Sequence, residues 1–377
     1  MPIQNSYEME NAMALDTSIR QYQGIRLKLA KEFVGFTGPD KKFRELAKLA
    51  AGDLDQSTDK PTTTTHKTYQ PSEIRRIRLH LLQGLFEEHK RALPPLINYR
   101  MSKGGTGKTT VSTNTASCCA QFGYRTLMID GDPQGSASKQ LGFDINQPLT
   151  HVGTILERLS KNQPTGIQKA VVPIYSGGML DLIPADITLA NDSWMISAMN
   201  RETLFQRLLE KEADFFKQYE VIILDSAPGT SLLTTTFMVA SKVITAVVIP
   251  EAQSVLALEV LESNIAEINS SFQGRNEPVG LHIIANRYRQ TYRSHNEALE
   301  KLGAKYAPYL NDTIIRDFAG FLRETDLEDY AKSAPVLEKE PNSVGARDII
   351  DVTKSLLKLY NVKLSAGKTL DGAGNNG

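Results

Sequence analysis

Cysteine is scarce in this sequence of 377 residues, and the two cysteines present, Cys118 and Cys119, are direct neighbours. That arrangement excludes a disulfide framework and every Cys-x-x-Cys metal or redox motif. The six histidines are scattered and give no zinc-binding spacing. Because both cysteines fall in a segment expected to be helical, we interpret them as buried structural thiols.

Long uncharged apolar runs are also missing. A membrane-spanning helix needs roughly 20 predominantly apolar residues, and no segment approaches that length. Residues 1–16 are polar and acidic, without the apolar core of a secretion signal. We therefore expect a cytoplasmic protein with no membrane partner.

An excess of charge of one sign is absent as well, because 43 basic residues balance 43 acidic residues. No global cationic field marks the chain as a nucleic-acid binder. Any contact with DNA must come from local patches of basic side chains.

From residue 96 onward, short apolar runs alternate with helical stretches. Such alternation predicts βαβ units, and hence an α/β fold with a doubly wound, mostly parallel sheet covered by helices on both faces. A last helix is expected over about residues 346–360. The expected strands cover residues 96–99, 126–129, 180–183, 221–224, 243–249 and 281–285.

The first 95 residues show helical periodicity instead of this alternation of apolar runs and helices. Apolar residues recur at helical spacing within residues 17–52, and a third helical block covers residues 71–91. The polar stretch 53–68 between them contains Pro61 and a run of threonines, so we interpret it as a linker or exposed loop. We therefore divide the chain into an N-terminal helical region (1–95), a main domain (96–362) and a Gly/Asn-rich tail (363–377) expected to be disordered.

A glycine-rich segment follows the first apolar run. It reads Lys-Gly-Gly-Thr-Gly-Lys-Thr-Thr over residues 103–110, between an expected strand and an expected helix. The simplest P-loop would need glycine in place of Ser102, so that pattern fails by one residue. Glycines let backbone N–H groups approach phosphates, and a helix N-terminus favours negative charge. The predicted phosphate contacts are Gly104, Gly105, Thr106, Gly107, Lys108, Thr109 and Thr110, with Lys108 at the β- and γ-phosphates and Thr109 on Mg²⁺.

Two aspartate motifs follow later strands. Asp130-Gly131-Asp132-Pro133-Gln134 comes after the second expected strand, and Asp225 comes after the fourth. An aspartate at the carboxyl end of a parallel strand beside a P-loop is where Mg²⁺ is held. We assign that role to Asp225, and we assign orientation of the attacking water to Asp132. Either aspartate taken alone could be a helix cap.

Together these motifs resemble the deviant-Walker P-loop ATPases, the group that contains ParA, MinD and Soj. The resemblance covers most of residues 96–360 and implies ATP or ADP as ligand, with Mg²⁺. It implies that Lys103 crosses a homodimer interface to reach the partner's nucleotide, which would make Lys103 catalytic together with Lys108 and Asp132. It also implies that Asn286, after the strand at 281–285, contacts the adenine base. An asparagine there is also an ordinary turn residue.

Within the group, Asp130–Gly135 and the later Ala-Pro-Val segment (334–336) are more similar to ParA partition proteins than to MinD. The larger ParA proteins carry an N-terminal winged helix-turn-helix that binds operator DNA, and residues 69–78 resemble its recognition-helix region. Arg75, Arg76 and Arg78 are then the expected DNA contacts. By itself, this segment also fits an ordinary solvated amphipathic helix.

The resemblance further implies non-specific DNA binding by the ATP-bound dimer. Arg316, Arg323 and Lys332 lie in the matching stretch, although four acidic residues between 324 and 329 weaken a simple patch argument. Arg287, Arg289 and Arg293 form another basic cluster.

The expected function is therefore that of a nucleoid-associated partition ATPase, weakly active and stimulated by a ParB-type centromere-binding partner, which also represses its own operon. Three alternatives remain: a MinD-like membrane-positioning ATPase, a nucleotide-binding transcriptional regulator with little turnover, and a metal-cluster carrier. The last needs cluster-ligating cysteines, which Cys118 and Cys119 do not supply.

Overall fold

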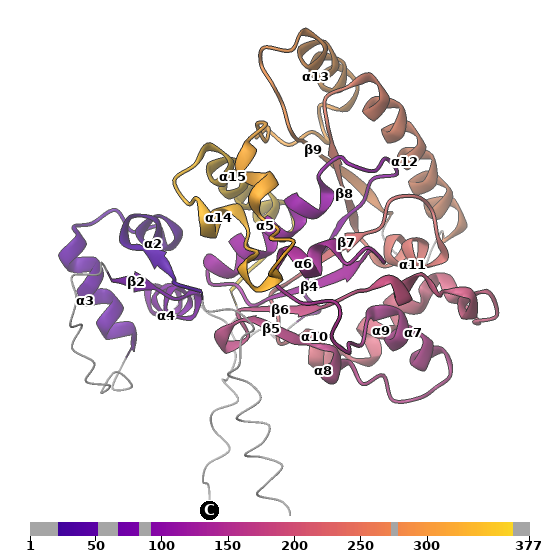
Figure 1. Ribbon diagram of the computed structural model, residues 1–377, viewed down its shortest axis with the longest axis horizontal. Helices are drawn as coiled ribbons and strands as arrows, with labels where there is room; N and C mark the ends of the chain where they lie inside the picture. Colours follow the sequence, from indigo (N-terminus) through magenta and orange to yellow (C-terminus); the bar gives the residue numbers. More distant parts are fainter. Residues whose placement is uncertain (1–21, 52–66, 83–91, 273–277, 365–377) are drawn as a thin grey trace, which may run out of the picture.

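The computed structural model describes residues 22–51, 67–82, 92–272 and 278–364. Its centre is a seven-stranded sheet with strand order β5-β6-β4-β7-β3-β8-β9 (Figure 1). Every neighbouring pair is parallel except β5 and β6. The strands are β3 (Leu96–Tyr99), β4 (Thr126–Gly131), β5 (Val172–Tyr175), β6 (Leu180–Ile183), β7 (Val221–Ser226), β8 (Val243–Val248) and β9 (Gly280–Ala285).

Helices cover both faces of this sheet, as the predicted α/β class requires. The helices of this domain are α5 (Lys108–Gln121), α6 (Ser136–Gln140), α7 (Val152–Ser160), α8 (Ile167–Ala170), α9 (Leu204–Lys211), α10 (Ala213–Phe216), α11 (Leu232–Ala240), α12 (Ala252–Ser271), α13 (Arg293–Tyr306), α14 (Val336–Lys339) and α15 (Val344–Leu359). Short 3₁₀ turns lie at 176–178, 187–190, 193–196, 201–203, 319–323 and 330–332.

Side chains of β7 show how one strand supplies two cores. Val221 and Ile223 belong to the cluster formed with α5 and α15, whereas Ile222 and Leu224 belong to the cluster formed with α7, α9 and α11. Successive side chains of a strand point to opposite faces, and both faces of β7 are covered, so its first four residues, Val221 to Leu224, are all apolar. All six residues of β7 are buried.

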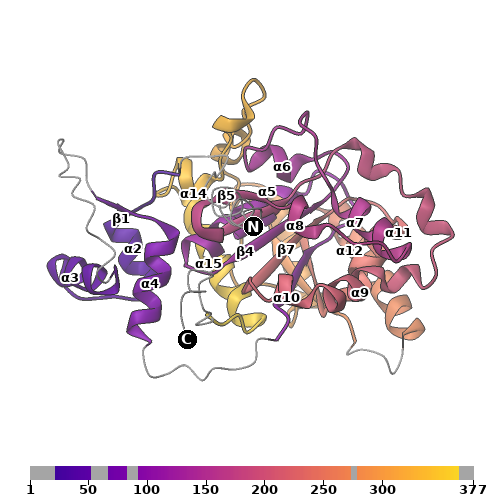
Figure 2. The ribbon, with the colours of Figure 1, turned by 90° about the horizontal axis from the view of Figure 1, so that it is seen from below.

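The N-terminal region forms a small unit beside the sheet domain (Figures 1 and 2). It contains α2 (Leu27–Val34), α3 (Asp40–Ala51) and α4 (Pro71–Leu81), with a two-residue antiparallel pair, β1 (Ile25–Arg26) and β2 (Thr68–Tyr69). Phe43 packs edge-on against Tyr69 with ring centroids 5.3 Å apart, which joins α3 to the strand pair. Most of the expected linker and the whole tail from residue 365 lie outside the described residues.

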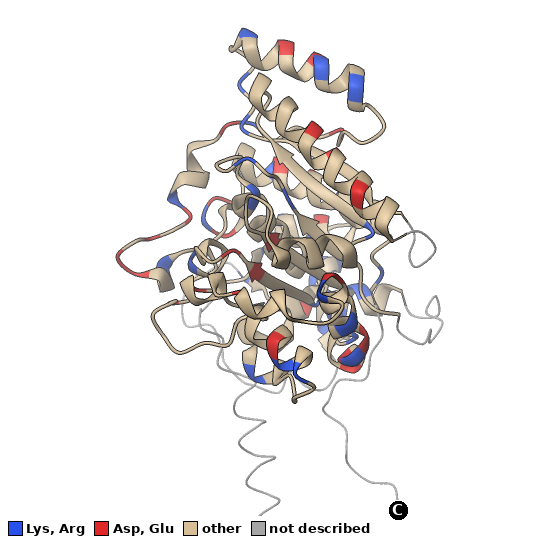
Figure 3. Ribbon diagram, turned by 90° about the vertical axis from the view of Figure 1, so that its right-hand side faces the viewer, with Lys and Arg blue, Asp and Glu red and all other residues tan. Residues whose placement is uncertain are grey.

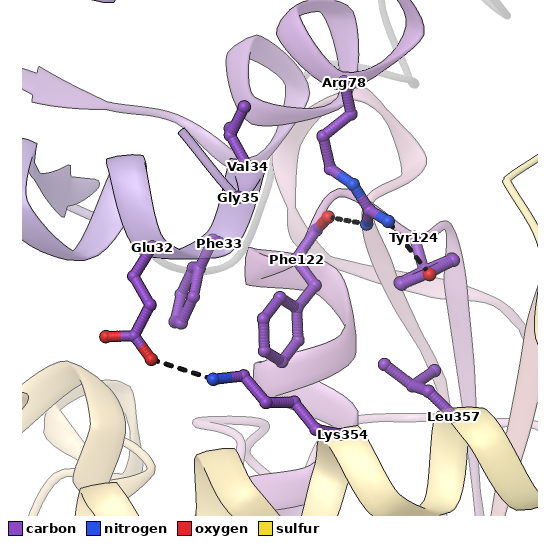
Figure 4. Close-up of a pocket in the computed structure, with 9 residues that line it drawn as sticks. All are labelled: Glu32, Phe33, Val34, Gly35, Arg78, Phe122, Tyr124, Lys354 and Leu357. Atoms are coloured by element: carbon purple, nitrogen blue, oxygen red, sulfur yellow. Dashed lines mark hydrogen bonds and ion pairs between the residues drawn. The ribbon is translucent and has the colours of Figure 1, made fainter. Parts of the chain in front are cut away.

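This unit is attached to the sheet domain through aromatic and charged contacts. Phe33 of α2 lies 4.4 Å, centroid to centroid, from Phe122 at the end of α5. Glu32 accepts hydrogen bonds from Arg347 and Lys354 of α15, at 2.7 and 2.8 Å. A cavity of about 350 Å³ lies at this junction (Figure 4), lined by Glu32, Phe33, Val34, Gly35, Arg78, Phe122, Tyr124, Lys354 and Leu357.

The two cysteines and the apolar character of the helices are both visible in the structure. Cys118 and Cys119 are both fully buried in α5, as expected for structural thiols, and burial raises the pKa of Cys118 to about 12. Among the helices that the structure describes, none is long and apolar enough to span a bilayer.

Candidate functional site: a phosphate-binding edge of the sheet

The glycine-rich segment forms the turn between β3 and α5. Gly105 and Gly107 have φ angles of 73° and 88°, a backbone region that side chains with a Cβ rarely adopt. A Cβ on Gly107 would also lie 2.3 Å from Nδ2 of Asn286. The sequence thus has glycine where the turn requires it, and the turn delivers the chain to the N-terminus of α5, where backbone N–H groups are free to bind an anion.

Lys108 is the first residue of α5, and its side chain is buried, with 6% of the residue exposed. Burial lowers the pKa of its ammonium group, and the carboxylates of Asp225 and Asp132 act in the opposite direction. The lysine and both predicted aspartates therefore share one small region at the carboxyl edge of the sheet.

Thr109 and Asp225 meet directly across this region. The Thr109 hydroxyl donates to Oδ2 of Asp225 at 2.7 Å. Burial, reinforced by the neighbouring Asp130, raises the pKa of Asp225 to about 7. Its other oxygen, Oδ1, is buried and has no hydrogen-bond partner.

Burying a carboxylate oxygen that has no hydrogen-bond partner costs free energy, unless a cation binds that oxygen. One carboxylate and one hydroxyl suit Mg²⁺, which keeps several waters and takes phosphate oxygens as further ligands. In the described ranges, no group of three or more His, Cys, Asp or Glu side chains is placed to hold a metal ion. These donors therefore fit a cation that a nucleotide shares, rather than an all-protein metal cage.

The two aspartates of the motif at the end of β4, Asp130 and Asp132, have different environments. Asp130 is fully buried and accepts hydrogen bonds from the N–H and hydroxyl of Ser138, at 2.8 and 2.7 Å, which ties β4 to α6. Burial raises the pKa of Asp130 to about 6. Asp132 is half-buried, and its Oδ1 accepts from the backbone N–H of Gln134 at 2.9 Å. Asp132 is thus the member of the pair that is open to the phosphate region.

Lys103, the second lysine of the P-loop, is turned toward its own chain. Its ammonium lies 3.4 Å from the Glu251 carboxylate, and Glu251 precedes the first residue of α12. The side chain of Lys103 is 27% exposed. Sequence reasoning did not single out Glu251.

Asn286 supports the P-loop in this structure. Its side-chain amide donates to the carbonyl of Thr106 at 2.8 Å, and the residue is buried. Contact between Asn286 and an adenine base stays a prediction.

Two of the three arginines that the sequence predicted to contact DNA, Arg75 and Arg78, bind other residues of this chain instead, so that prediction is wrong for these two. Arg75 is buried and binds both carboxylate oxygens of Glu220, at 2.8 and 3.0 Å, and the carbonyl of Gly123. Arg78 donates to the Phe122 carbonyl and to the Tyr124 hydroxyl (Figure 4). Both side chains join α4 to the sheet domain, while Arg76 is exposed.

The basic residues expected to bind DNA non-specifically are paired with acids. Arg316 binds both oxygens of Asp348, Arg323 lies 2.6 Å from Glu340, and Lys332 lies 3.3 Å from Asp329. Arg287 and Arg289 both approach Asp317, and Arg293 pairs with Glu297. Along α13, Figure 3 shows basic and acidic residues interspersed rather than gathered into a basic stripe.

Comparison with known proteins agrees with the motifs. A family model described as an AAA domain matches residues 96–277. The cell division protein PomZ of Myxococcus xanthus is 29% identical over 301 residues, which cover 79% of this chain and 87% of PomZ. The sporulation initiation inhibitor protein Soj of Bacillus subtilis is 28% identical over 256 residues, covering 67% of this chain and 94% of Soj. This chain is thus similar to PomZ, to Soj and to a ParA family protein of Chlamydia psittaci.

Two solved structures share the fold of the sheet domain. The ATP complex of a Cyanothece McdA variant superposes with a TM-score of 0.59 at 17% identity, over 72% of this chain and 98% of McdA. A putative plasmid partition protein from Borrelia burgdorferi bound to AMPPNP gives 0.55 at 18% identity, over 71% of this chain and 99% of that protein. The sheet domain therefore shares the fold of these two nucleotide-bound proteins.

Proposed function

We propose that this chain is an ATP-hydrolysing switch for DNA partition. ATP closes a homodimer that binds DNA non-specifically on the nucleoid, and slow hydrolysis, stimulated by a ParB-type partner, reopens it. The observation that carries this proposal is the Thr109–Asp225 pair, with its unpartnered carboxylate oxygen, beside the buried Lys108. Homology to ParA-type ATPases, and AMPPNP bound to a partition protein of the same fold, support it.

Each residue at the site has a distinct role in this proposal. The N–H groups of the P-loop and the Lys108 ammonium bind the β- and γ-phosphates, while Thr109 and Asp225 hold Mg²⁺. The bound ion neutralises phosphate charge. Asp132 orients the attacking water. Lys103 leaves Glu251 and contacts the nucleotide of the second subunit, so the site is complete only in the dimer.

The proposal is tested with two variants of the full chain. Lys108→Ala removes the buried cation at the phosphates, so ATP-dependent dimerisation measured by light scattering should be lost. Asp132→Ala should retain ATP binding, reduce turnover at least tenfold and trap the dimer. Lys161→Ala, which changes an exposed lysine of a surface ion pair, is the control. Dimerisation of Lys108→Ala at wild-type ATP concentrations would argue against an ATP switch.

We further propose that the N-terminal unit binds operator DNA through α3 rather than α4, so that the protein represses its own operon. Lys41, Arg44 and Lys48 are exposed and recur at helical spacing, so they share one face of α3. A different face of α3 buries Phe43 and Ala47. α2 and α3 are joined by a short turn that begins at Gly35, with a φ of 75°, as in helix-turn-helix units.

Operator binding can be measured on DNA from upstream of the protein's own gene, with ATP, ADP or no nucleotide. Lys41→Ala and Lys48→Ala should each weaken binding, and each should reduce the slope of log affinity against log salt by about 0.9 if one phosphate contact is lost. Arg76→Ala tests the earlier assignment to α4. A loss of affinity in Arg76→Ala, with none in the α3 variants, would return the DNA contact to α4.

A further inference from the structure

Arg100 is a buried cation that has no acidic partner among the residues that the structure describes. It follows β3 directly, its backbone N–H bonds to the Thr245 carbonyl of β8, and none of the residue is exposed. Within the described part of the chain, no carboxylate pairs with its guanidinium, and its Nε has no hydrogen-bond partner. Burial lowers the pKa of the group to about 10. Taking such a charge out of water costs several kcal/mol, so the contacts that it does make are informative.

Apart from a 3.4 Å hydrogen bond to the neighbouring Met101 carbonyl, those contacts go to the loop that follows Asp225. Nη1 of Arg100 donates to the carbonyl of Ala227 at 3.1 Å, and Nη2 donates to the carbonyl of Gly229. The two carbonyls flank Pro228, in a loop whose residues 228–230 are exposed. A planar guanidinium can span two acceptors in a fixed geometry, whereas the compact ammonium of lysine cannot.

The position of this loop matters because of what lies at its start. β7 ends with Asp225 and Ser226, and Asp225 contacts Thr109 of the P-loop helix. Arg100 itself stands three residues before Lys103, and its charge acts on Lys108. One side chain thus fixes the loop after β7 relative to the strand that leads into the P-loop.

The hydrogen bond to Gly229 also sets the direction of a peptide group. No peptide bond among the described residues is cis, and in a trans peptide the carbonyl and the N–H point in opposite directions. Because the Gly229 carbonyl is turned inward to Arg100, the Thr230 N–H of the same peptide unit points away from it, at the exposed end of the loop.

We propose that Arg100 is a positioning residue for ATP hydrolysis, which holds residues 227–229 in the geometry that the Asp225 site requires. The proposal rests on the proposed function, because it assumes ATP turnover at this site. Sequence reasoning did not single out Arg100, although a lone charge between a buried strand and the P-loop was a visible signal.

The experiment compares Arg100→Met and Arg100→Lys with the wild-type full chain. Hydrogen–deuterium exchange of the peptide spanning 227–231, ATP affinity and kcat are measured together. This loop should exchange at least tenfold faster in both variants, and kcat should fall at least tenfold in Arg100→Met, with ATP affinity changed less than threefold. Arg158→Met is the matched control, because Arg158 is a half-buried arginine that donates to a loop carbonyl, that of Thr165, away from the site.

Wild-type loop exchange in the Arg100 variants would overturn the proposal, and so would faster exchange with unchanged kcat. If Arg100→Met does not fold, the proposal is tested on Arg100→Lys, which keeps the buried charge but cannot span both carbonyls. If the wild-type chain does not hydrolyse ATP under any condition, the proposed function fails. The exchange measurement then still shows whether Arg100 holds the loop, so the two failures are distinguishable.

Discussion

Among single side chains, Glu324 has the environment with the clearest consequence for stability. It is 1% exposed and accepts hydrogen bonds from the Asn114 amide and the Val336 N–H, both at 2.6 Å, and from Gln140. It therefore joins α5, α6 and the first residue of α14. Burial outweighs these hydrogen bonds and raises the pKa of Glu324 to about 8.

The raised pKa predicts a pH-dependent effect of Glu324→Gln. Between the ordinary carboxyl range and about pH 8, the folded protein holds a proton at Glu324 that the unfolded chain releases. Wild-type stability should therefore fall as pH rises through this window, whereas glutamine contributes no such slope. The free energy of unfolding of the variant, relative to wild type, should increase by up to ~3 kcal/mol from about pH 5 to about pH 8.

Urea denaturation of both proteins at both pH values measures this difference. A loss of stability caused by missing hydrogen bonds is the same at both pH values, so it does not affect the change between them. An unchanged difference across the window would show that Glu324 is ionised throughout, held by its three donors.

At the scale of elements, a buried ion pair joins α4 to the residue that precedes β7. Arg75 and Glu220 have side chains that are 8% and 2% exposed, and Glu220 also accepts from the Arg125 N–H at 2.6 Å. A buried carboxylate that loses its cation pays the full cost of desolvation.

Arg75→Met should therefore lower the free energy of unfolding by ~3 kcal/mol. The double variant Arg75→Met/Glu220→Gln should lose less than the sum of the single changes, because it leaves no buried unpaired charge. The exposed pair Lys161–Glu157 supplies the control, with at most ~1 kcal/mol expected for Lys161→Met. An equal loss of unfolding free energy in Arg75→Met and Lys161→Met would show that the Arg75–Glu220 pair is no more important for stability than an exposed ion pair.

Local patterns predicted most of the sheet from the sequence. β3 and β6 match their predicted bounds, and β4, β7, β8 and β9 differ by one or two residues at their ends. β5 was missed, because Val172–Tyr175 is a short edge strand that contains Pro173 and pairs antiparallel, where no helical crossover marks it. The P-loop was predictable because its glycines, lysines and threonines lie within one short segment, residues 103–110.

Contacts between distant segments were not predictable. Arg75 and Glu220 are 145 residues apart, and Arg100 and Ala227 are 127 apart. An arginine-rich helix has the same pattern whether its guanidinium groups meet DNA or a neighbouring domain. The sequence could therefore indicate that α4 carries charge, but not which partner receives it.

For the whole molecule, the Lys103–Glu251 ion pair is a contact that dimerisation must break if Lys103 reaches the second subunit. Glu251→Gln should then lower the ATP concentration for half-maximal dimerisation, roughly two- to fivefold for a partly exposed pair. Light scattering over an ATP titration measures the shift. Glu259→Gln is the matched control, since Glu259 lies on α12, which Glu251 immediately precedes, but pairs with Lys305. An equal shift in both variants would point to general charge on α12.

The placement of α5 has one more consequence. Its first residue, Lys108, lies at the phosphate site, and Phe122 and Gly123, just beyond its last residue, contact the N-terminal unit over a helix of roughly 21 Å. Ligands at the two ends of one rigid element obey thermodynamic reciprocity: the factor by which ATP alters affinity for operator DNA equals the factor by which that DNA alters affinity for ATP. If the N-terminal unit binds operator DNA as proposed, a nucleotide titration with and without that DNA would measure this single coupling constant.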